Sequence, residues 1–320
     1  MAAAQHIPLS NGRWGLVAWE QIQPGTIIRQ EEPLVFVDLP VSYVEWSDKM
    51  EQDFYAAEYD EHDKSRYITK ALSKLSDAQR GAFRQISTHR SFRLTWRLDI
   101  NRFQLNATVV PHTLPDGRTM TRLVVLHSLC GINHSCRPNS VFKWSGEQGV
   151  VRAITAIAPG EEIVLDRLPE DVKWRSASQR KTYLKERYAY SCGCSDCHPD
   201  TCKQGDQIRR RLRDLREKLK QSITSEAAPE QKSKTKEILR DLSLANEYLS
   251  LIRQLTWRDE RLVEAHVCLA KALEASGDHN SAKEHAVLAI VMAARVHGSD
   301  VSGGVVVMVI EILQRCFQAV

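Results

Sequence analysis

The sequence predicts an α+β protein in which a β-rich region precedes an all-helical region. Short β-branched runs separated by turn residues recur up to about residue 166, and beyond residue 206 apolar residues recur at helical spacing. Four of the eight cysteines lie between residues 192 and 202. A chain of 320 residues that is 42% hydrophobic is long enough for one large or two ordinary packed cores.

The first strands are expected in residues 7–37. The runs "GLVAWEQI" and "TIIRQEEPLVFVD" are rich in β-formers and are separated by the turn dipeptide Pro24-Gly25. From about 41 to 95 the pattern becomes helical, and Ser76 or Asp77 is available to cap a helix. This segment is therefore predicted to be a helical insertion in a β-rich domain.

Strands return between residues 98 and 166. They are expected in "TRLVVLHSL", "SVFKWSG", "GVVRAITAI" and, after the turn "APGEE", in "IVLD". Residues 175–188 are predicted to form one helix that leads into the cysteine cluster.

The remainder is predicted to be helical around a polar loop or linker, "SITSEAAPEQKSKTK", at residues 222–236. Residues 261–298 are expected to form a helical hairpin broken at Gly277-Asp278, with a capping box made by Ser281 and Glu284. Its small-residue spacing is similar to a tetratricopeptide repeat, although one hairpin is a weak repeat signal. The run "GVVVMVIEIL" could be a strand or a buried helix.

Charge and hydropathy limit the classes of partner. The net charge is only +4, and the basic run at 209–220 interleaves three leucines, which favours a solvated helix face over a nucleic-acid surface. No secretory signal pattern and no run of roughly 18 apolar residues occurs, so we expect a soluble intracellular protein without a membrane span.

The cysteine cluster predicts a structural metal site. In a reducing compartment, clustered cysteines indicate metal binding, and structural zinc takes four soft ligands. "CGCSDC" supplies Cys192, Cys194 and Cys197, so one ligand is missing locally. The candidates for the fourth are Cys202 and Cys136, the latter in "GINHSCRPNS" at residues 131–140.

Five blocks in a fixed order resemble the SET-domain protein-lysine methyltransferases, over residues 9–202. They are "GRWGLVAWEQIQPGTIIRQEEPLV", "NRFQLNA", "NHSCRPN", "AIAPGEEI" and "QRKTYLKERYAYSCGCSDC". The helical insertion and helical C-terminal part look like the SET-and-MYND subgroup or related fungal-type SET proteins. No cysteine precedes residue 130, so we expect no zinc-binding MYND module.

The resemblance implies a knot-like SET core and three domains. They would be a SET domain at 1–190 with its insertion at about 41–95, a post-SET zinc segment at 191–205 and a helical, tetratricopeptide-like C-terminal domain at 206–320. It also implies that Cys136 is the fourth zinc ligand, so that the "NHSC" segment couples the post-SET tail to the cofactor floor.

The resemblance further implies an S-adenosylmethionine site. The expected cofactor-binding residues are Arg13, Trp14, Gly15, Asn101, Asn133, His134 and Tyr190. Backbone groups of Asn133 and His134 would hold the adenine, and Tyr190 would stack on it. Only Gly15 matches the family's glycine-rich first turn cleanly, because Arg13 stands where a glycine is usual, unless Trp14 is an insertion and Gly12 takes that place.

The catalytic positions carried over are Phe103 and Tyr188, as walls of a lysine channel, and Arg167. The family's catalytic tyrosine is expected seven residues after Gly160, where this chain has Arg167. A guanidinium beside the sulfonium would be costly, about 4 kcal/mol for like charges about 4 Å apart at an effective dielectric of 20. The side chain could instead turn outward and pair with Asp166, Glu170 or Asp171.

Two functions follow from these expectations. The first is an S-adenosylmethionine-dependent protein-lysine methyltransferase, and the second is a catalytically degenerate SET scaffold with purely structural zinc. In either case we expect a monomeric nuclear or cytoplasmic protein that binds a substrate or partner protein through the SET groove and the helical domain, without direct nucleic-acid binding.

Overall fold

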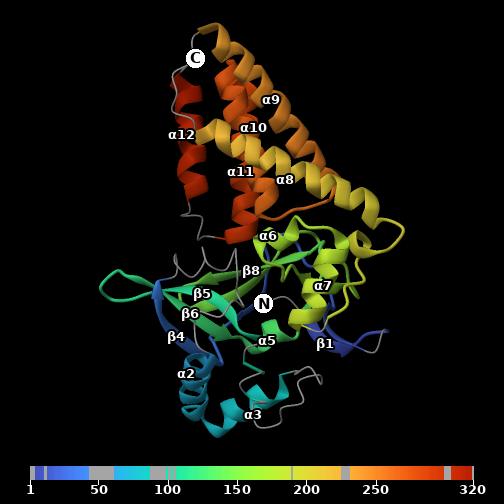
Figure 1. Ribbon diagram of the computed structural model, residues 1–320, viewed down its shortest axis with the longest axis vertical. Helices are drawn as coiled ribbons and strands as arrows, with labels where there is room; N and C mark the ends of the chain where they lie inside the picture. Colours follow the sequence, from blue (N-terminus) through green and yellow to red (C-terminus); the bar gives the residue numbers. More distant parts are fainter. Residues whose placement is uncertain are drawn as a thin grey trace.

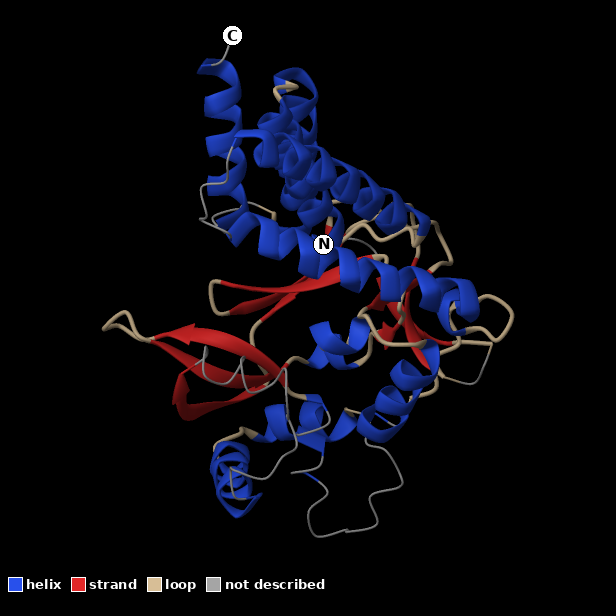
Figure 2. Ribbon diagram, turned by 45° about the horizontal axis from the view of Figure 1, so that its top comes forward, coloured by secondary structure: helices blue, strands red, loops and turns tan. Residues whose placement is uncertain are grey.

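A computed structural model describes residues 4–10, 13–42, 61–86, 99, 102–103, 106–188, 190–224, 231–298 and 304–318. The mixed α+β architecture is confirmed: strands fill the middle of the molecule, and a helical region made from the C-terminal part of the chain stands on one side of them (Figure 1). Figure 2 shows the same division, with the strands gathered below the long helices.

The strands form three small sheets. The first has the order β1-β2-β10-β7, with bounds Ala4–Pro8, Trp14–Ala18, Glu162–Leu165 and Asn133–His134. The second has the order β3-β9-β8, with bounds Ile27–Glu31, Gln148–Ala153 and Ser140–Ser145. The third has the order β4-β6-β5, with bounds Val35–Ser42, Thr119–Val125 and Thr108–Thr113.

The pairing of β7 with β10 brings together residues of the candidate functional site. It is parallel, with Val164 opposite Asn133 and Leu165 opposite His134, whereas β10 pairs antiparallel with β2. The chain reverses between β2 and β3 at Pro24-Gly25, where Gly25 adopts a φ of 90° that favours glycine. The last strand, β10, therefore lies between β2 and the short "NH" segment of β7.

Two helices of the predicted insertion are seen, α2 at Glu61–Ser73 and α3 at Asp77–Gln85. Ser76 caps α3 in a capping box with Gln79, because its side chain accepts from the Gln79 N–H while the Gln79 side chain accepts from the Ser76 N–H. Phe83 of α3 packs in a core shared with β4 and Phe103. Figure 1 shows both helices on the side of the strands opposite the C-terminal helices.

Four short helical elements occur among the described residues between positions 127 and 197. They are α5 at His127–Cys130, α6 at Glu170–Lys173, α7 at Ala177–Tyr188 and the 3₁₀ turn η2 at Ser195–Cys197. The helix predicted over 175–188 is thus confirmed as α7.

The C-terminal region contains α8 at Cys202–Thr224, α9 at Gln231–Gln254, α10 at Glu260–Ser276, α11 at His279–His297 and α12 at Gly304–Gln318. The segment "GVVVMVIEIL" lies in α12, which decides between strand and helix in favour of the helix. The loop predicted at 222–236 is wrong for residues 222–224 and 231–236, because α8 continues to Thr224 and α9 already begins at Gln231. In α9 these polar residues add turns to a helix whose apolar stripe begins later.

The hairpin between α10 and α11 is confirmed, but its predicted cap is wrong. Gly277 ends α10 in the left-handed region, with a φ of 87°. The N-cap of α11 is Asp278, whose carboxylate accepts from the Ser281 N–H at 3.1 Å. Ser281 therefore lies inside the first turn, because the acidic side chain three residues earlier satisfies its N–H.

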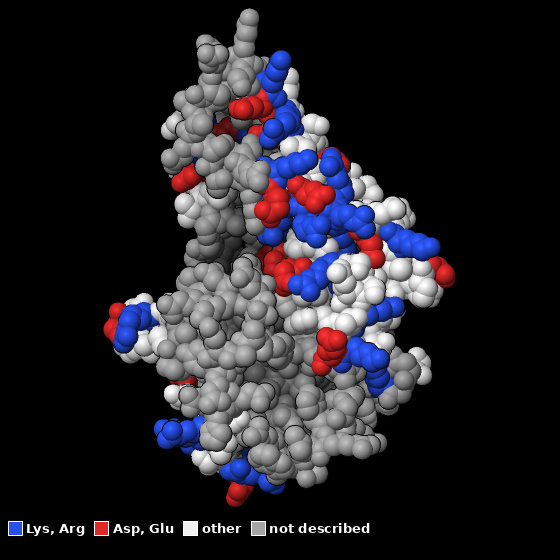
Figure 3. All heavy atoms as spheres, in the orientation of Figure 1, with Lys and Arg blue, Asp and Glu red and all other residues white. Residues whose placement is uncertain are grey.

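The basic run on α8 is only partly a solvated face. Leu212, Leu215 and Leu219 are buried as its spacing predicts, but Arg209 is buried as well. Other arginines of the run pair with acids of neighbouring helices, such as Arg211 with Glu247 at 2.6 Å. In Figure 3, blue and red side chains are interspersed over this face, so it is not a continuous basic surface.

None of the described helices is long and apolar enough to cross a membrane.

Candidate functional site

The centre of the candidate site is the turn from α5 into β7. Glu31 of β3 fixes the start of α5, because its carboxylate accepts from the Ser128 N–H at 2.8 Å and from the Leu129 N–H at 3.2 Å. An acidic group is favourable there because the first N–H groups of a helix have no partner within it. The end of α5 is held by Arg167, which follows β10.

Arg167 binds backbone carbonyls at the end of α5. Its Nη2 donates to the Leu129 carbonyl and, at 2.8 Å, to the Ile132 carbonyl, and its Nε also donates to Ile132 at 3.2 Å. The expected outward ion pair is not formed. Among the described residues Arg167 has no ion pair with Asp166, Glu170 or Asp171, and it binds carbonyls at and just after the C-terminal end of α5, where a cation is favourable.

Three residues from three strands meet beside this turn. The side-chain amide of Asn133 on β7 donates to the Trp14 carbonyl at 2.8 Å and to Glu162 Oε1 on β10 at 2.6 Å. Gly15 on β2 lies against both, since a Cβ there would be 2.6 Å from Glu162 Oε1 and 3.2 Å from Asn133 Nδ2. A larger residue at position 15 would have to displace these side chains, so the close approach favours glycine.

His134 is buried and oriented by its neighbours. Its Nδ1 accepts from the Arg167 N–H at 3.0 Å, which leaves Nε2 directed at Cys136 Sγ, 3.4 Å away. The hydroxyl of Tyr190 donates to the His134 carbonyl at 2.7 Å, and the Arg13 guanidinium lies 4.8 Å from the centre of the Tyr190 ring. Burial raises the pKa of the Tyr190 hydroxyl, against the opposing effect of Arg13.

The structure assembles a four-cysteine cluster from Cys136, Cys192, Cys194 and Cys197. Their Sγ atoms all lie within 4.8 Å of one another, and Cys136 is 3.6 Å from Cys197. Sulfur atoms at the corners of a tetrahedron with zinc–sulfur bonds of about 2.3 Å are about 3.8 Å apart, so the donor set fits zinc. Cys202 is outside the cluster and donates to the Pro199 carbonyl, which leaves Cys136 as the fourth candidate ligand.

The thiols of the cluster shift one another's pKa values. Contact with the Cys136 thiol makes the largest contribution to lowering the pKa values of Cys194 and Cys197, and to raising that of Cys192. A group of thiols in which some ionise easily suits a metal that binds thiolates.

A buried ionic group supports the cysteine cluster from the helical side. Asp196, between Cys194 and Cys197, is 2% exposed and forms ion pairs with Arg137 and with Arg209 of α8. Arg180 of α7 donates to the Asp196 carbonyl at 2.9 Å and lies 3.7 Å from Cys197 Sγ. These contacts fix the turn that presents two of the four sulfur atoms.

The helical region also contacts the "NHSC" segment directly. Trp257, between α9 and α10, is buried, and its indole N–H donates to the Cys136 carbonyl at 3.3 Å. The Arg261 guanidinium lies 3.6 Å from the centre of the Trp257 ring and 3.4 Å from Asp166, and it also pairs with Asp259. The helical region thus contacts both the segment that follows β7 and the segment that follows β10.

The two expected channel aromatics lie in different clusters. Phe103 is completely buried with Val125, Phe83 and other residues on the side of the insertion. Tyr188 is half-buried against the cluster that contains Leu184 and the cysteines. The lysine channel between them therefore stays a prediction.

Two other expected positions lie outside the described residues, Asn101 and the alternative glycine, Gly12. Trp14 is 65% exposed, with only its carbonyl in contact with the site through Asn133.

Comparison with known domain families matches residues 13–166 to the SET domain. The chain contains a SET domain. The match ends at Asp166, so the four-cysteine cluster, apart from Cys136, lies beyond it.

Curated relatives match shorter parts of the chain. Mouse "Protein-lysine N-methyltransferase SMYD4" is 36% identical over 70 residues, which are 22% of this chain and 9% of the relative. Mouse "Protein-lysine N-trimethyltransferase SMYD5" is 39% identical over 77 residues, 23% of this chain and 18% of the relative. Arabidopsis thaliana "Histone-lysine N-methyltransferase ASHR1" is 31% identical over 100 residues, 31% and 19% of the two chains.

These matches make the chain similar to SET-domain lysine methyltransferases, but each spans less than a fifth of the relative's own length. Among solved structures, the methyltransferase domain of human PR domain-containing protein 2 aligns with 53% of this chain and 82% of its own at 13% identity. Its TM-score of 0.24 is too low to support an argument.

Sequence reasoning missed four supports of this site: Glu31, Glu162, Asp196 and Trp257. Glu162 had a signal, because it stands in the "GEEI" block that marks β10. Asp196 stands within the "CGCSDC" motif. Glu31 and Trp257 come from segments far away in sequence, and a lone Glu or Trp carries no spacing pattern that would relate it to residues 131–140.

Proposed function

We propose that this chain is an S-adenosylmethionine-dependent protein-lysine N-methyltransferase. The observation that carries the proposal is the meeting of Gly15, Asn133 and Glu162 within a SET domain. The relatives named above are lysine methyltransferases by name, and a protein lysine is the substrate that this similarity favours. A nuclear or cytoplasmic location fits such substrates.

The polar groups at this meeting point fit the amino-acid end of the cofactor. Both amide hydrogens of Asn133 are used on Trp14 and Glu162, so its Oδ1 has no partner among the described residues and can accept from an ammonium group. The Glu162 carboxylate adds negative charge beside it. The adenine would lie near His134 and Tyr190, with Arg13 moved from the ring face that it now covers.

S-adenosylmethionine would supply the methyl group, and the residues of this chain would orient the acceptor and keep its amine neutral. Free lysine has a pKa of about 10.4, so burial near aromatic walls must favour the deprotonated form. Tyr188 is the half-buried aromatic on the cysteine side that could supply such a wall and a hydroxyl. Zinc would be structural, bound by Cys136, Cys192, Cys194 and Cys197.

The geometry of Arg167 favours a second candidate, a SET scaffold without catalysis. The side chain at the position expected for the catalytic tyrosine is bound to two carbonyls, and it places a positive charge one residue from Asn133. A cation there weakens binding of a cationic cofactor. In this alternative the helical region and the SET groove would bind a partner protein.

The two candidates are separated by transfer of labelled methyl groups into a source-cell lysate, together with calorimetric titration of S-adenosylmethionine. For the enzyme, we expect incorporation by the wild type and a loss of at least tenfold in Asn133→Ala. Asn280→Ala, an exposed asparagine on α11, is the matched control and should keep full activity.

A folded, zinc-loaded wild type that neither binds the cofactor nor transfers methyl groups would refute the enzyme. Activity gained by Arg167→Tyr in that case would support the degenerate scaffold, because it would show that one residue blocks an otherwise intact site.

A further inference from the structure

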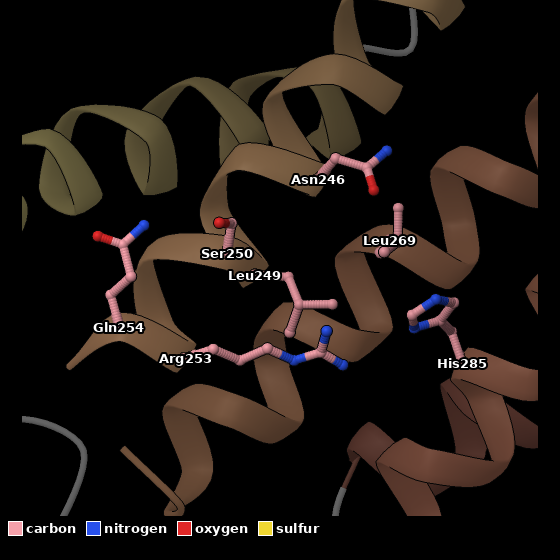
Figure 4. A pocket seen from close by; sticks show the side chains of 7 residues that line it. All are labelled: Asn246, Leu249, Ser250, Arg253, Gln254, Leu269 and His285. Carbon is pink, nitrogen blue, oxygen red and sulfur yellow. The ribbon is translucent and has the colours of Figure 1, made fainter. Parts of the chain in front are cut away.

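A hollow of about 520 Å³ opens in the helical region, outside the SET domain. Four polar residues line it from one face of α9: Asn246, Ser250, Arg253 and Gln254. Leu249 and Leu269 supply apolar surface, and His285 supplies the opposite wall from α11. Figure 4 shows the Arg253 guanidinium extending toward the side of the His285 ring.

The hollow is rich in donors and lacks acids. No Asp or Glu is among its lining residues. The Arg253 guanidinium, which is exposed, has no ion pair or hydrogen bond among the described residues, unlike the arginines of α8 that pair with glutamates. An unpaired guanidinium beside amide and hydroxyl donors is a surface that an oxyanion can satisfy.

A pair of histidines completes the wall. His285 Nδ1 lies 2.9 Å from Nδ1 of His266 on α10, so one ring must donate its proton to the other. Burial is the largest cause that lowers the pKa of His266, to about 4, with His285 and Arg253 adding to it, so His266 is neutral near pH 7. Burial and Arg253 also lower the pKa of His285, against the opposing effect of Glu284.

Because His266 stays neutral, it can accept the Nδ1 proton of a charged His285. A protonated His285 would then donate through Nδ1 to His266 and through Nε2 to an anion in the hollow. The positive charge that now opposes protonation of His285 would be offset by that anion. Arg253 and His285 would thus act together only when the hollow is filled.

We propose that this hollow binds a phosphoryl group, held between Arg253 and His285. A phosphoryl dianion has three strong acceptor oxygens, which match the guanidinium fork, the imidazolium and the Ser250 or Gln254 donors better than the two oxygens of a carboxylate do. The hollow is larger than the ion itself, and Leu249 and Leu269 offer apolar surface to the group that carries it. A phosphate monoester is therefore the favoured ligand over free phosphate.

The test uses the full chain and calorimetric titration with inorganic phosphate, phenyl phosphate and acetate at pH 7.5. We expect saturable binding of phosphate, roughly tenfold tighter binding of phenyl phosphate through its contact with the leucines, and acetate at least tenfold weaker. Phenyl phosphate no tighter than phosphate would assign the site to free phosphate. Acetate as tight as phosphate, or no saturable phosphate binding, would overturn the proposal.

The variant Arg253→Gln should weaken phosphate binding at least tenfold. The matched control is Arg240→Gln, which removes the same charge from an exposed position on α9 roughly 20 Å away along the helix. Equal losses in both variants would mean attraction by net charge alone and would overturn the site.

A second readout follows the His285 ring by nuclear magnetic resonance, assigned with His285→Gln. Saturating sulfate, a tetrahedral dianion that does not titrate near neutral pH, should raise the His285 pKa by about one unit. An unchanged His285 pKa on saturation would exclude the contact between this ring and the anion.

Discussion

Arg167→Met should destabilise the protein because the arginine holds the end of α5 in place. The substitution keeps an apolar stem of similar length and removes the donors to the carbonyls of Leu129 and Ile132. Hydrogen bonds from a charged donor contribute about 1.5–3 kcal/mol each to stability. Taking the low end for two carbonyls, because Arg167 is half-buried, gives a loss of about 3 kcal/mol in the free energy of unfolding.

The loss can be measured by urea denaturation followed by tryptophan fluorescence, with the variant compared at an unchanged slope. Arg80→Met is the matched control, because Arg80 is also half-buried but makes, among the described residues, one long bond to a carbonyl, that of Leu75 at 3.3 Å. We expect the control to lose under 0.5 kcal/mol, in the range of ordinary surface substitutions. A loss of less than about 1 kcal/mol in Arg167→Met would refute the role of this arginine as a structural clamp.

Three further predictions concern the supports of the site. Elemental analysis of freshly purified protein should find about one zinc per chain. Cys194→Ser should lower both the zinc content and the melting temperature, because zinc binding at a structural site contributes to the free energy of folding. Wild-type protein free of zinc would contradict this. Trp257→Phe should lower the free energy of unfolding by about 1 kcal/mol, because it leaves the buried Cys136 carbonyl without the indole donor. It should also speed the release of zinc to a chelator. An unchanged release rate would show that the helical region does not support the metal site. The pKa of His266 is lowered to about 4 in the folded chain, so the free energy of unfolding should fall as pH decreases from about 6.5 toward 4. The fall should be at most about 1.4 kcal/mol per pH unit. The same measurement on His266→Gln should show a smaller dependence on pH.

The local patterns of the sequence were sufficient for most elements. Alternating β-branched runs predicted the strands, Ser76 predicted a helix start, and three leucines on α8 predicted its buried face. The errors occurred where a contact outside the pattern decided the outcome. Asp278 replaced Ser281 as the cap, and the polar start of α9 became helical although it has few apolar residues.

The candidate site likewise has a part that the sequence motifs indicated and a part that they did not. The order of motifs placed Gly15 and Asn133 among the expected cofactor-binding residues, and the structure brings the two close together. It also named Cys136 as a ligand although 56 residues separate it from Cys192. The contacts of Arg167 could not be predicted, because they depend on where the folded chain places the Leu129 and Ile132 carbonyls around the end of α5. Sequence spacing identifies which residue stands at a position, whereas the direction of a long charged side chain depends on the unsatisfied groups around it.

The clamp by Arg167 changes how a rescue experiment must be interpreted. Arg167→Tyr would restore the hydroxyl expected of the family but would also release the end of α5, the segment that leads directly into Asn133 and His134. Activity in that variant would therefore arise despite a loss of about 3 kcal/mol of support, and would be strong support for an intact cofactor site. An absence of activity would be informative only if the variant kept its zinc and its fold, because a disordered "NHSC" segment would abolish methyl transfer for a structural reason.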